Sequence, residues 1–334
     1  MNTGTVNPAH INTELRPLSL GELLDRTAQL YRAHFLLFVG IAVFPRALLL
    51  GWQLVQIAVT HFLDTRHMSS TVFVVFAAIF AYVLYFAFVG LGVAAINDAV
   101  SAIYLGRAAT IAGSYERVKQ RWARYTGVIC VAALYAWGPT LVPYSAYLVV
   151  MGAAGKKIVP GAMGAGSPAI MLIIARAGFL FLFTIPYGVW MSLRYSLAVP
   201  ASIFEGIGVR AALKRSVALT KKGRGRIFLM ALLVGIVFWT IFGAAQMPLF
   251  IILYKAAKTH RQQPLSALIA SQVISFVLYS IIGPIYGIGI TLFYYDERIR
   301  KEGFDIEYMM QQANLGDVEA APTAGVPVLE IGPQ

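Results

Sequence analysis

Six stretches of the chain are each apolar over more than about 20 residues, the length that an α-helix needs to cross the hydrocarbon core of a bilayer. They cover residues 35–59, 71–96, 126–151, 169–193, 227–253 and 265–293. None of them shows the period-two alternation of apolar and polar residues that is typical of a membrane barrel strand. The pattern therefore predicts an all-α fold, a polytopic membrane bundle of six transmembrane helices.

The composition supports this class. Of the 334 residues, 13% are charged and 58% are hydrophobic, whereas about a quarter of a soluble protein is charged. These values exclude a disordered chain, a disulfide-rich protein and an ordinary cytosolic enzyme. Residues 1–15 and 311–334 are polar, small or rich in Pro and Gly, so we expect disordered tails on either side of a membrane domain at 16–310.

The charge is strongly basic, with 27 Lys and Arg against 15 Asp and Glu. Nineteen of these cations flank the spans on one side of the predicted bundle and six on the other. By the positive-inside rule, both termini are expected in the cytoplasm. The excess also predicts affinity for anionic lipid headgroups, and the dispersal of the cations among separate loops argues against nucleic acid as a partner.

An internal repeat is visible at the ends of the even-numbered spans. Tyr104-Leu105-Gly106, Phe204-Glu205-Gly206 and Lys301-Glu302-Gly303 recur at separations of 100 and 97 residues. An amphipathic stretch precedes each pair of spans, and the first of these stretches begins with Ser19 and Glu22 at capping-box spacing. We therefore expect three pseudo-repeats, each an interfacial helix followed by a helical hairpin.

The interfacial stretches carry apolar residues on one face and cations elsewhere. In the second stretch the apolar positions Ile111, Tyr115, Val118 and Trp122 follow helical spacing. The cations expected to contact lipid headgroups are Arg117, Arg121, Arg124, Lys214 and Arg215. Each such contact with an anionic leaflet contributes about 1 kcal/mol.

Two arginines lie inside the predicted spans. Arg46 is 11 residues into the first span, about 16 Å along the helix axis, and Arg176 lies inside the fourth. A guanidinium at that depth costs about 2.5–3.5 kcal/mol on insertion scales. One interpretation is an anion or ligand site, a polar cavity lined by Arg46 and Arg176. The other is that each arginine binds carbonyls freed at the proline kinks or extends its side chain to the interface.

No catalytic, cofactor or metal motif is found. The sequence has neither a phosphate-binding loop nor a zinc-binding H-E-x-x-H pattern. His61, Asp64 and His67 lie close enough in the sequence to bind a metal, but a short solvated outer loop is the favoured interpretation. Tyr294-Tyr295-Asp296-Glu297-Arg298 is interpreted as an interfacial aromatic pair followed by a charged helix end. We therefore expect no enzyme activity, no cofactor and no metal.

The segment from Arg16-Pro17-Leu18-Ser19-Leu20 to Asp25-Arg26, together with the stretches that begin at Phe204 and Tyr294, resembles a bacterial family of uncharacterised membrane proteins. The family is similar to the membrane domain attached to some glycerophosphoryl diester phosphodiesterases. The resemblance covers about residues 16–310 and leaves no room for the phosphodiesterase barrel. It implies a multi-pass protein of the bacterial cytoplasmic (inner) membrane without phosphodiesterase activity.

Two functions remain open at this point. The first is a non-enzymatic membrane protein that organises or assists other components at the cytoplasmic leaflet. The alternative is a transporter or lipid-handling protein that binds an anion or a headgroup near Arg46 and Arg176. A continuous mid-membrane cavity lined by both arginines would favour the alternative, and a solidly packed bundle with exposed basic helices would favour the first.

Overall fold

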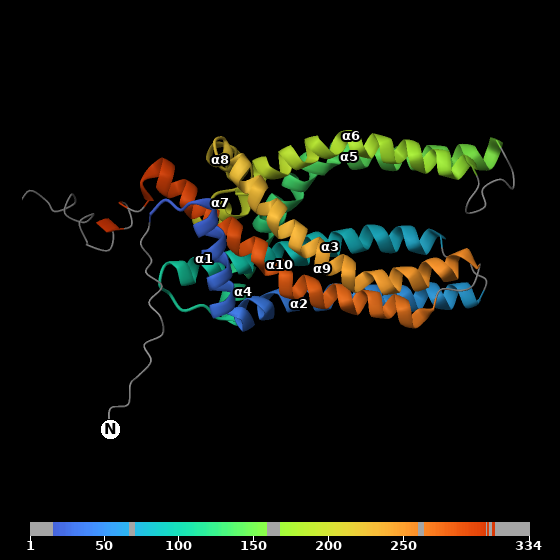
Figure 1. Cartoon of the computed structure of the whole chain (residues 1–334), viewed down its shortest axis with the longest axis horizontal. Helices are drawn as coiled ribbons and strands as arrows, with labels where there is room; N and C mark the ends of the chain where they lie inside the picture. The colour runs from blue at the N-terminus through green and yellow to red at the C-terminus, as the bar shows by residue number, and fades with distance from the viewer. Residues whose placement is uncertain are drawn as a thin grey trace, which may run out of the picture.

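The computed structural model describes residues 16–66, 71–158, 168–259 and 264–304, together with 306, 309 and 310. Within these ranges the chain is helical and contains no strand. The predicted tails, 1–15 and 311–334, lie outside the described residues. The helices, shown in Figure 1, are α1 (Leu20–Ala33), α2 (Phe35–Thr65), α3 (Thr71–Tyr104), α4 (Ile111–Lys119), α5 (Trp122–Ile158), α6 (Pro168–Tyr195), α7 (Ala198–Phe204), α8 (Val209–Thr220), α9 (Arg224–Lys258) and α10 (Leu265–Glu302).

Four helices in the described part are long and apolar enough to cross a membrane. The qualifying segments are Phe35–Leu63, Leu84–Tyr104, Arg224–Ala256 and Leu265–Glu302, with mean hydropathy between 1.7 and 2.5. The chain is therefore a multi-pass membrane protein. The two remaining predicted spans lie within α5 and α6, which pack against each other along their length.

The short helices gather at one end of the molecule. Figure 1 shows α1, α4, α7 and α8 around the C-terminal end of α10, while the long helices run away from them toward the opposite end. At that opposite end, the α5–α6 pair lies apart from the group formed by α2, α3, α9 and α10. The predicted interfacial stretches therefore lie at one end of the molecule.

Helix α1 shows why such a stretch folds locally. The backbone N–H of Ser19 donates to Glu22 Oε2 at 2.7 Å, and the N–H of Glu22 donates to Ser19 Oγ at 3.3 Å, which confirms the predicted capping box. Leu23, Thr27 and Leu30 then fall on one face and are buried against the core.

The three glycines of the predicted repeat share one backbone conformation. Gly106, Gly206 and Gly303 have φ values of 72°, 64° and 65°, in the left-handed region that glycine adopts without steric cost. Each follows the end of a helix, so each lets the chain leave that helix and turn back.

The largest buried cluster of the described residues lies at the end that holds the short helices and packs against them. The ring of Tyr295 stacks on Tyr104 at a centroid distance of 4.8 Å and meets Phe204 at 5.1 Å, so the ends of α3, α7 and α10 converge on one aromatic cluster. Tyr294 and Tyr295 are both buried, as are the next two residues, Asp296 and Glu297. The last turn of α10 is charged as predicted, but the short helices cover the aromatic pair and the first two charges, so these residues are buried within the protein.

Candidate functional site

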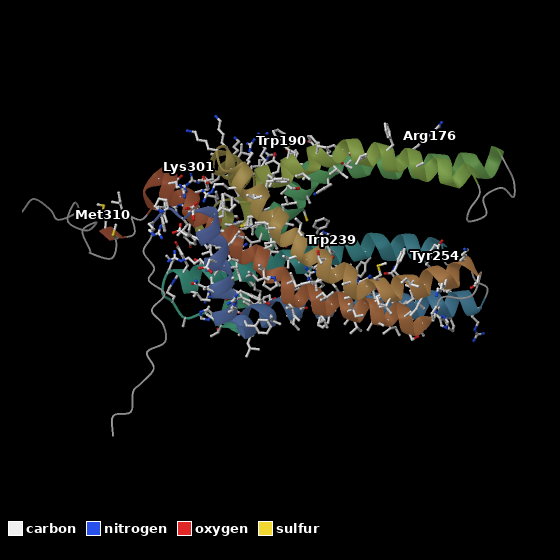
Figure 2. The ribbon with its side chains drawn as sticks, viewed as in Figure 1. Arg176, Trp190, Trp239, Tyr254, Lys301 and Met310 are labelled. Carbon is white, nitrogen blue, oxygen red and sulfur yellow. The ribbon has the colours of Figure 1, made fainter. Side chains whose placement is uncertain are left out.

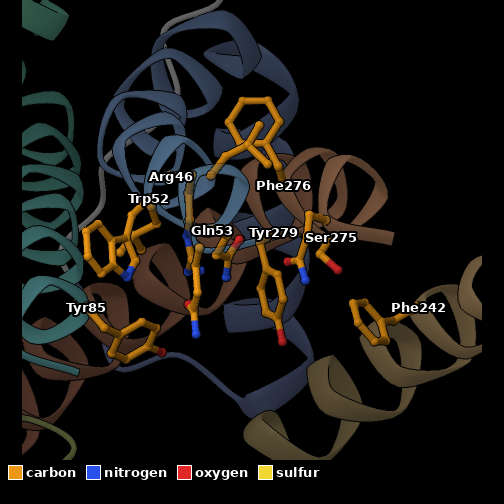
Figure 3. Close-up of a pocket in the computed structure, with 12 residues that line it drawn as sticks. Arg46, Trp52, Gln53, Tyr85, Phe242, Ser275, Phe276 and Tyr279 are labelled. Carbon is orange, nitrogen blue, oxygen red and sulfur yellow. The ribbon is translucent and has the colours of Figure 1, made fainter. Parts of the chain in front are cut away.

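A pocket of about 560 Å³ lies among four of the long helices, α2, α3, α9 and α10. Figure 3 shows how its side chains surround the central space. The lining residues are Arg46, Leu49, Leu50, Trp52, Gln53, Gln56, Tyr85, Phe242, Gln272, Ser275, Phe276 and Tyr279. Its volume falls within the range of about 300–1,000 Å³ that is typical of small-ligand sites.

Two polar stripes on otherwise apolar helices create the pocket. On α2, Arg46, Gln53 and Gln56 are separated by seven and three residues, which places them on one helix face. On α10, Gln272, Ser275 and Tyr279 are separated by three and four residues and also share a face. Because α2 and α10 pack against each other, the two stripes face a common space.

Among the described residues that line the pocket, Arg46 is the one that carries a charge. Its guanidinium lies over the ring of Tyr279, with its central carbon 4.8 Å from the ring centroid, in a cation–π arrangement. None of the twelve lining residues is acidic, and within the described ranges Arg46 forms no ion pair with a carboxylate. The pocket therefore presents a net positive charge of one.

Close packing fixes the position of this arginine. The preceding residue, Pro45, is buried and faces α3 at Gly92. A Cβ atom built on Gly92 would lie 2.8 Å from Pro45 Cγ, so no larger residue fits there without a shift. This contact holds α2 close to α3 one residue before Arg46.

One hydrogen-bonded group links α9 to α10 and includes Ser275 of the pocket lining. Gln246 Nε2 donates to Ser275 Oγ at 2.8 Å and to the carbonyl of Ser271 at 3.0 Å, and Ser271 Oγ donates to Gln246 Oε1 at 3.1 Å. These bonds satisfy Gln246 and orient Ser275. They join the two helices by polar contacts within the membrane segment.

Other polar groups of the pocket lack a protein partner. The indole Nε1 of Trp52 is buried and makes no hydrogen bond in the described structure. The side-chain amides of Gln53, Gln56 and Gln272 make none to the described residues either. Unpaired polar groups at membrane depth are unfavourable, so this lining is suited to a bound polar molecule.

The second predicted arginine lies elsewhere. Arg176 is exposed on α6 and does not line the pocket. In Figure 2 it lies on the α5–α6 pair, apart from the group of helices that contains α2 and α10. The pocket is therefore lined by Arg46 and not by Arg176, so the two predicted site residues do not share it.

The five cations predicted to contact headgroups divide into two sets. Three are bound within the protein: Arg117 pairs with both oxygens of Asp98, Arg124 donates to the carbonyl of Gly206, and Arg215 bridges Glu205 and Glu302. Hydrogen bonds from Arg215 to Glu302 and Glu205 raise the pKa of its guanidinium above the ordinary value. Arg121 and Lys214 are exposed and have no acidic partner in the described ranges.

A further ionic group joins the N-terminal segment to the end of α10. Asp296 is buried and pairs with Arg226 at 2.9 Å and with Arg300 at 3.0 Å. Both arginines also donate to the backbone carbonyl of Leu18. Every charge in this group has a partner, so the group is suited to holding the helices together.

The comparisons with known proteins concern the second half of the chain. Residues 168–314 match the family model described as the membrane domain of glycerophosphoryl diester phosphodiesterase. This confirms the resemblance over helices α6 to α10, which contribute Phe242, Gln272, Ser275, Phe276 and Tyr279 to the pocket. The match is to a membrane domain and not to a catalytic domain. No curated protein and no solved structure matches the chain.

Proposed function

We propose that this membrane protein binds the headgroup of an anionic lipid in the pocket around Arg46. The observation that carries the proposal is a half-buried cation that has no carboxylate partner among the described residues and lines a pocket within the membrane-spanning part. A charge at that depth is costly, and an anionic ligand would compensate it.

The lining supports a lipid better than a free inorganic ion. About half of the lining is aliphatic or aromatic, including Leu49, Leu50, Phe242 and Phe276. An inorganic ion would leave this surface without a partner, whereas a lipid would place its glycerol backbone and the first part of its chains there.

The surrounding architecture in this proposal has six spans in three pseudo-repeats, with both termini in the cytoplasm of a bacterial inner membrane. The inclusion of α5 and α6 as spans is supported by their apolar sequence and by their place beside the other long helices in Figure 1. The orientation is supported by the cation count of the sequence, in which 19 cations flank the predicted spans on the side of the short helices and six flank them on the other side.

The role we propose is handling of a lipid and not chemistry upon it. None of the described lining residues has a carboxylate, imidazole or thiol that could serve as an acid, base or nucleophile. Among the residues that the structure describes, no group of three His, Cys, Asp or Glu side chains could hold a metal ion. Binding and positioning of a lipid require neither a catalytic side chain nor a metal ion.

A second candidate function, organisation of other components at the cytoplasmic leaflet, is supported by a different observation. Arg121, Lys214, Lys221 and Lys222 are exposed at the end that holds the short helices. This surface fits anionic headgroups or an acidic partner. Replacing Lys221 and Lys222 with Ser should weaken binding of the intact protein to such a partner and leave the Arg46 pocket unaffected.

Native mass spectrometry of the purified protein with added phosphatidylglycerol tests the main proposal. Arg46→Leu should lower the bound fraction about tenfold or more, because it removes the only charge of the lining. Arg176→Leu is the matched control, an exposed intramembrane arginine outside the pocket, and should bind like the wild type. Equal loss in both variants, or no loss in Arg46→Leu, would contradict the proposal.

A further inference from the structure

The charge and the hydrogen-bonding groups of the pocket lining favour some anionic lipids over zwitterionic ones. We propose that it prefers a lipid whose phosphodiester carries a single negative charge and whose headgroup is uncharged and hydroxylated, as in phosphatidylglycerol, over lipids with an amine headgroup. This inference rests on the proposed function and names its ligand class.

The charge of the lining argues against an amine. Arg46 gives the pocket one positive charge, and none of the twelve described lining residues is Asp or Glu. The ammonium of phosphatidylethanolamine would enter beside the guanidinium without a carboxylate partner, and like charges in a weakly screened site repel. A singly charged phosphodiester leaves pocket and lipid together electrically neutral.

Two of the aromatic residues that line the pocket, Tyr279 and Trp52, are already engaged within the protein. Cation–π binding of an ammonium needs a free ring face. The face of Tyr279 is already covered by Arg46, 4.8 Å from the ring centroid. The ring of Trp52 packs edge-to-face on Phe80 at 4.7 Å, so it too is engaged within the protein.

The neutral polar residues argue for hydroxyl groups. Each carboxamide of Gln53, Gln56 and Gln272 offers two N–H donors and one carbonyl acceptor. Phosphate oxygens only accept, so they would satisfy the N–H groups and leave the carbonyls unpaired. A hydroxyl both donates and accepts hydrogen bonds. A headgroup with two hydroxyls can therefore donate to the side-chain carbonyls and accept from the side-chain N–H groups of the glutamines.

The arrangement along α2 assigns a place to each part of the ligand. Arg46 is half-buried, and the exposed Gln53 follows seven residues later on the same face, about 10 Å along the helix axis. The phosphate therefore belongs at Arg46, the positive charge among the described lining residues. The headgroup hydroxyls belong toward the glutamines, and the acyl chains lie against Phe242 and Phe276.

Three lipids separate the parts of this inference in a competition measured by native mass spectrometry. Phosphatidylmethanol has the same charge as phosphatidylglycerol without headgroup hydroxyls, and phosphatidylethanolamine has an amine. We expect the wild type to bind phosphatidylglycerol about tenfold more strongly than either competitor, a difference of about 1.4 kcal/mol. Deacylated glycerophosphoglycerol, a soluble source of the same headgroup, should compete poorly.

Variants separate the headgroup preference from lipid binding itself. Gln53→Leu with Gln272→Leu should lower phosphatidylglycerol binding to the level of phosphatidylmethanol, and phosphatidylmethanol binding should stay unchanged. Arg46→Leu should weaken both. If the wild type binds these two lipids equally and Arg46→Leu still weakens both, the hydroxyl preference is wrong and the proposed function stands.

Three further results would each contradict a part of this account. If neither lipid depends on Arg46, the proposed function itself fails. If the deacylated headgroup competes as well as the intact lipid, the ligand is a soluble phosphodiester and the assignment to a lipid is wrong. Stronger binding of phosphatidylethanolamine would overturn the charge argument.

Discussion

The backbone N–H of Leu18 donates a hydrogen bond of 2.7 Å to Oδ1 of Asp296, a residue 278 positions later in the chain. Asp296 thereby ties the segment before α1 to the last helix, and its pairing with Arg226 and Arg300 fixes both sides of the contact. The N-terminal and C-terminal parts of the described chain are therefore joined at the end of the molecule that holds the short helices.

Removal of this carboxylate should destabilise the protein. Asp296→Ala leaves the N–H of Leu18 and two guanidinium groups without their acceptor, and we expect a loss of about 2–4 kcal/mol. Asp25→Ala is the control, because Asp25 is exposed and accepts only from Gln29 on its own helix. Thermal unfolding in detergent measures both variants, and equal stability of the two would contradict this account of Asp296.

The packing around Gly223 gives a second test. A Cβ atom at Gly223 would collide with the carboxylate of Glu297, which is buried and paired with Lys301. Gly223→Ala should therefore lower the stability by about 1–3 kcal/mol. Gly225→Ala, two residues later in open space, should be neutral or stabilise by up to about 1 kcal/mol. A Gly225→Ala loss as large as that of Gly223→Ala would contradict the packing argument.

The capping box of α1 predicts a dependence on pH. Hydrogen bonds from Ser19 and Arg16 lower the pKa of Glu22 from 4.5 to about 2. A lowered pKa means that the stabilisation is complete above pH 4.5 and is lost as the pH falls toward 2. The thermal stability of the wild type should exceed that of Glu22→Gln at pH 7, and the difference should narrow below pH 4.5. If the difference in thermal stability between the wild type and Glu22→Gln stayed constant down to pH 3, this account of the capping box would be wrong.

The proposed orientation is tested by labelling single cysteines in a Cys130→Ala background. Lys119→Cys and Lys222→Cys lie at the end that holds the short helices, and Arg66→Cys and Thr259→Cys lie at the opposite end. A membrane-impermeant maleimide added to intact cells should label the second pair and spare the first. Labelling of Lys222→Cys from outside would reverse the orientation.

Local sequence patterns predicted the helical class, the apolar stretches and the capping box at Ser19, because each depends on neighbouring residues. They also identified Arg46, because a charge inside an apolar stretch is visible without a structure. The burial of Asp296 was missed, since it depends on Leu18 and Arg226 meeting it from distant parts of the chain. The same limit left open whether Arg46 and Arg176 share a cavity.

The rest of the pocket did leave a signal in the sequence. Gln53 and Gln56, and Gln272 and Ser275, are pairs of polar residues three apart within apolar stretches, which places each pair on one helix face. This spacing could have identified a polar stripe on each helix. Only the packing of α2 against α10 shows that the two stripes face each other.

The central claim, that the pocket at Arg46 holds an anionic lipid, is tested most directly by an experimental structure of the protein in a bilayer that contains phosphatidylglycerol. The account predicts density for a phosphate within hydrogen-bond distance of the Arg46 guanidinium, with the headgroup toward Gln53 and Gln272. A pocket that stays empty, or that is filled by protein side chains while lipid occupies only the outer surface of the bundle, would contradict it.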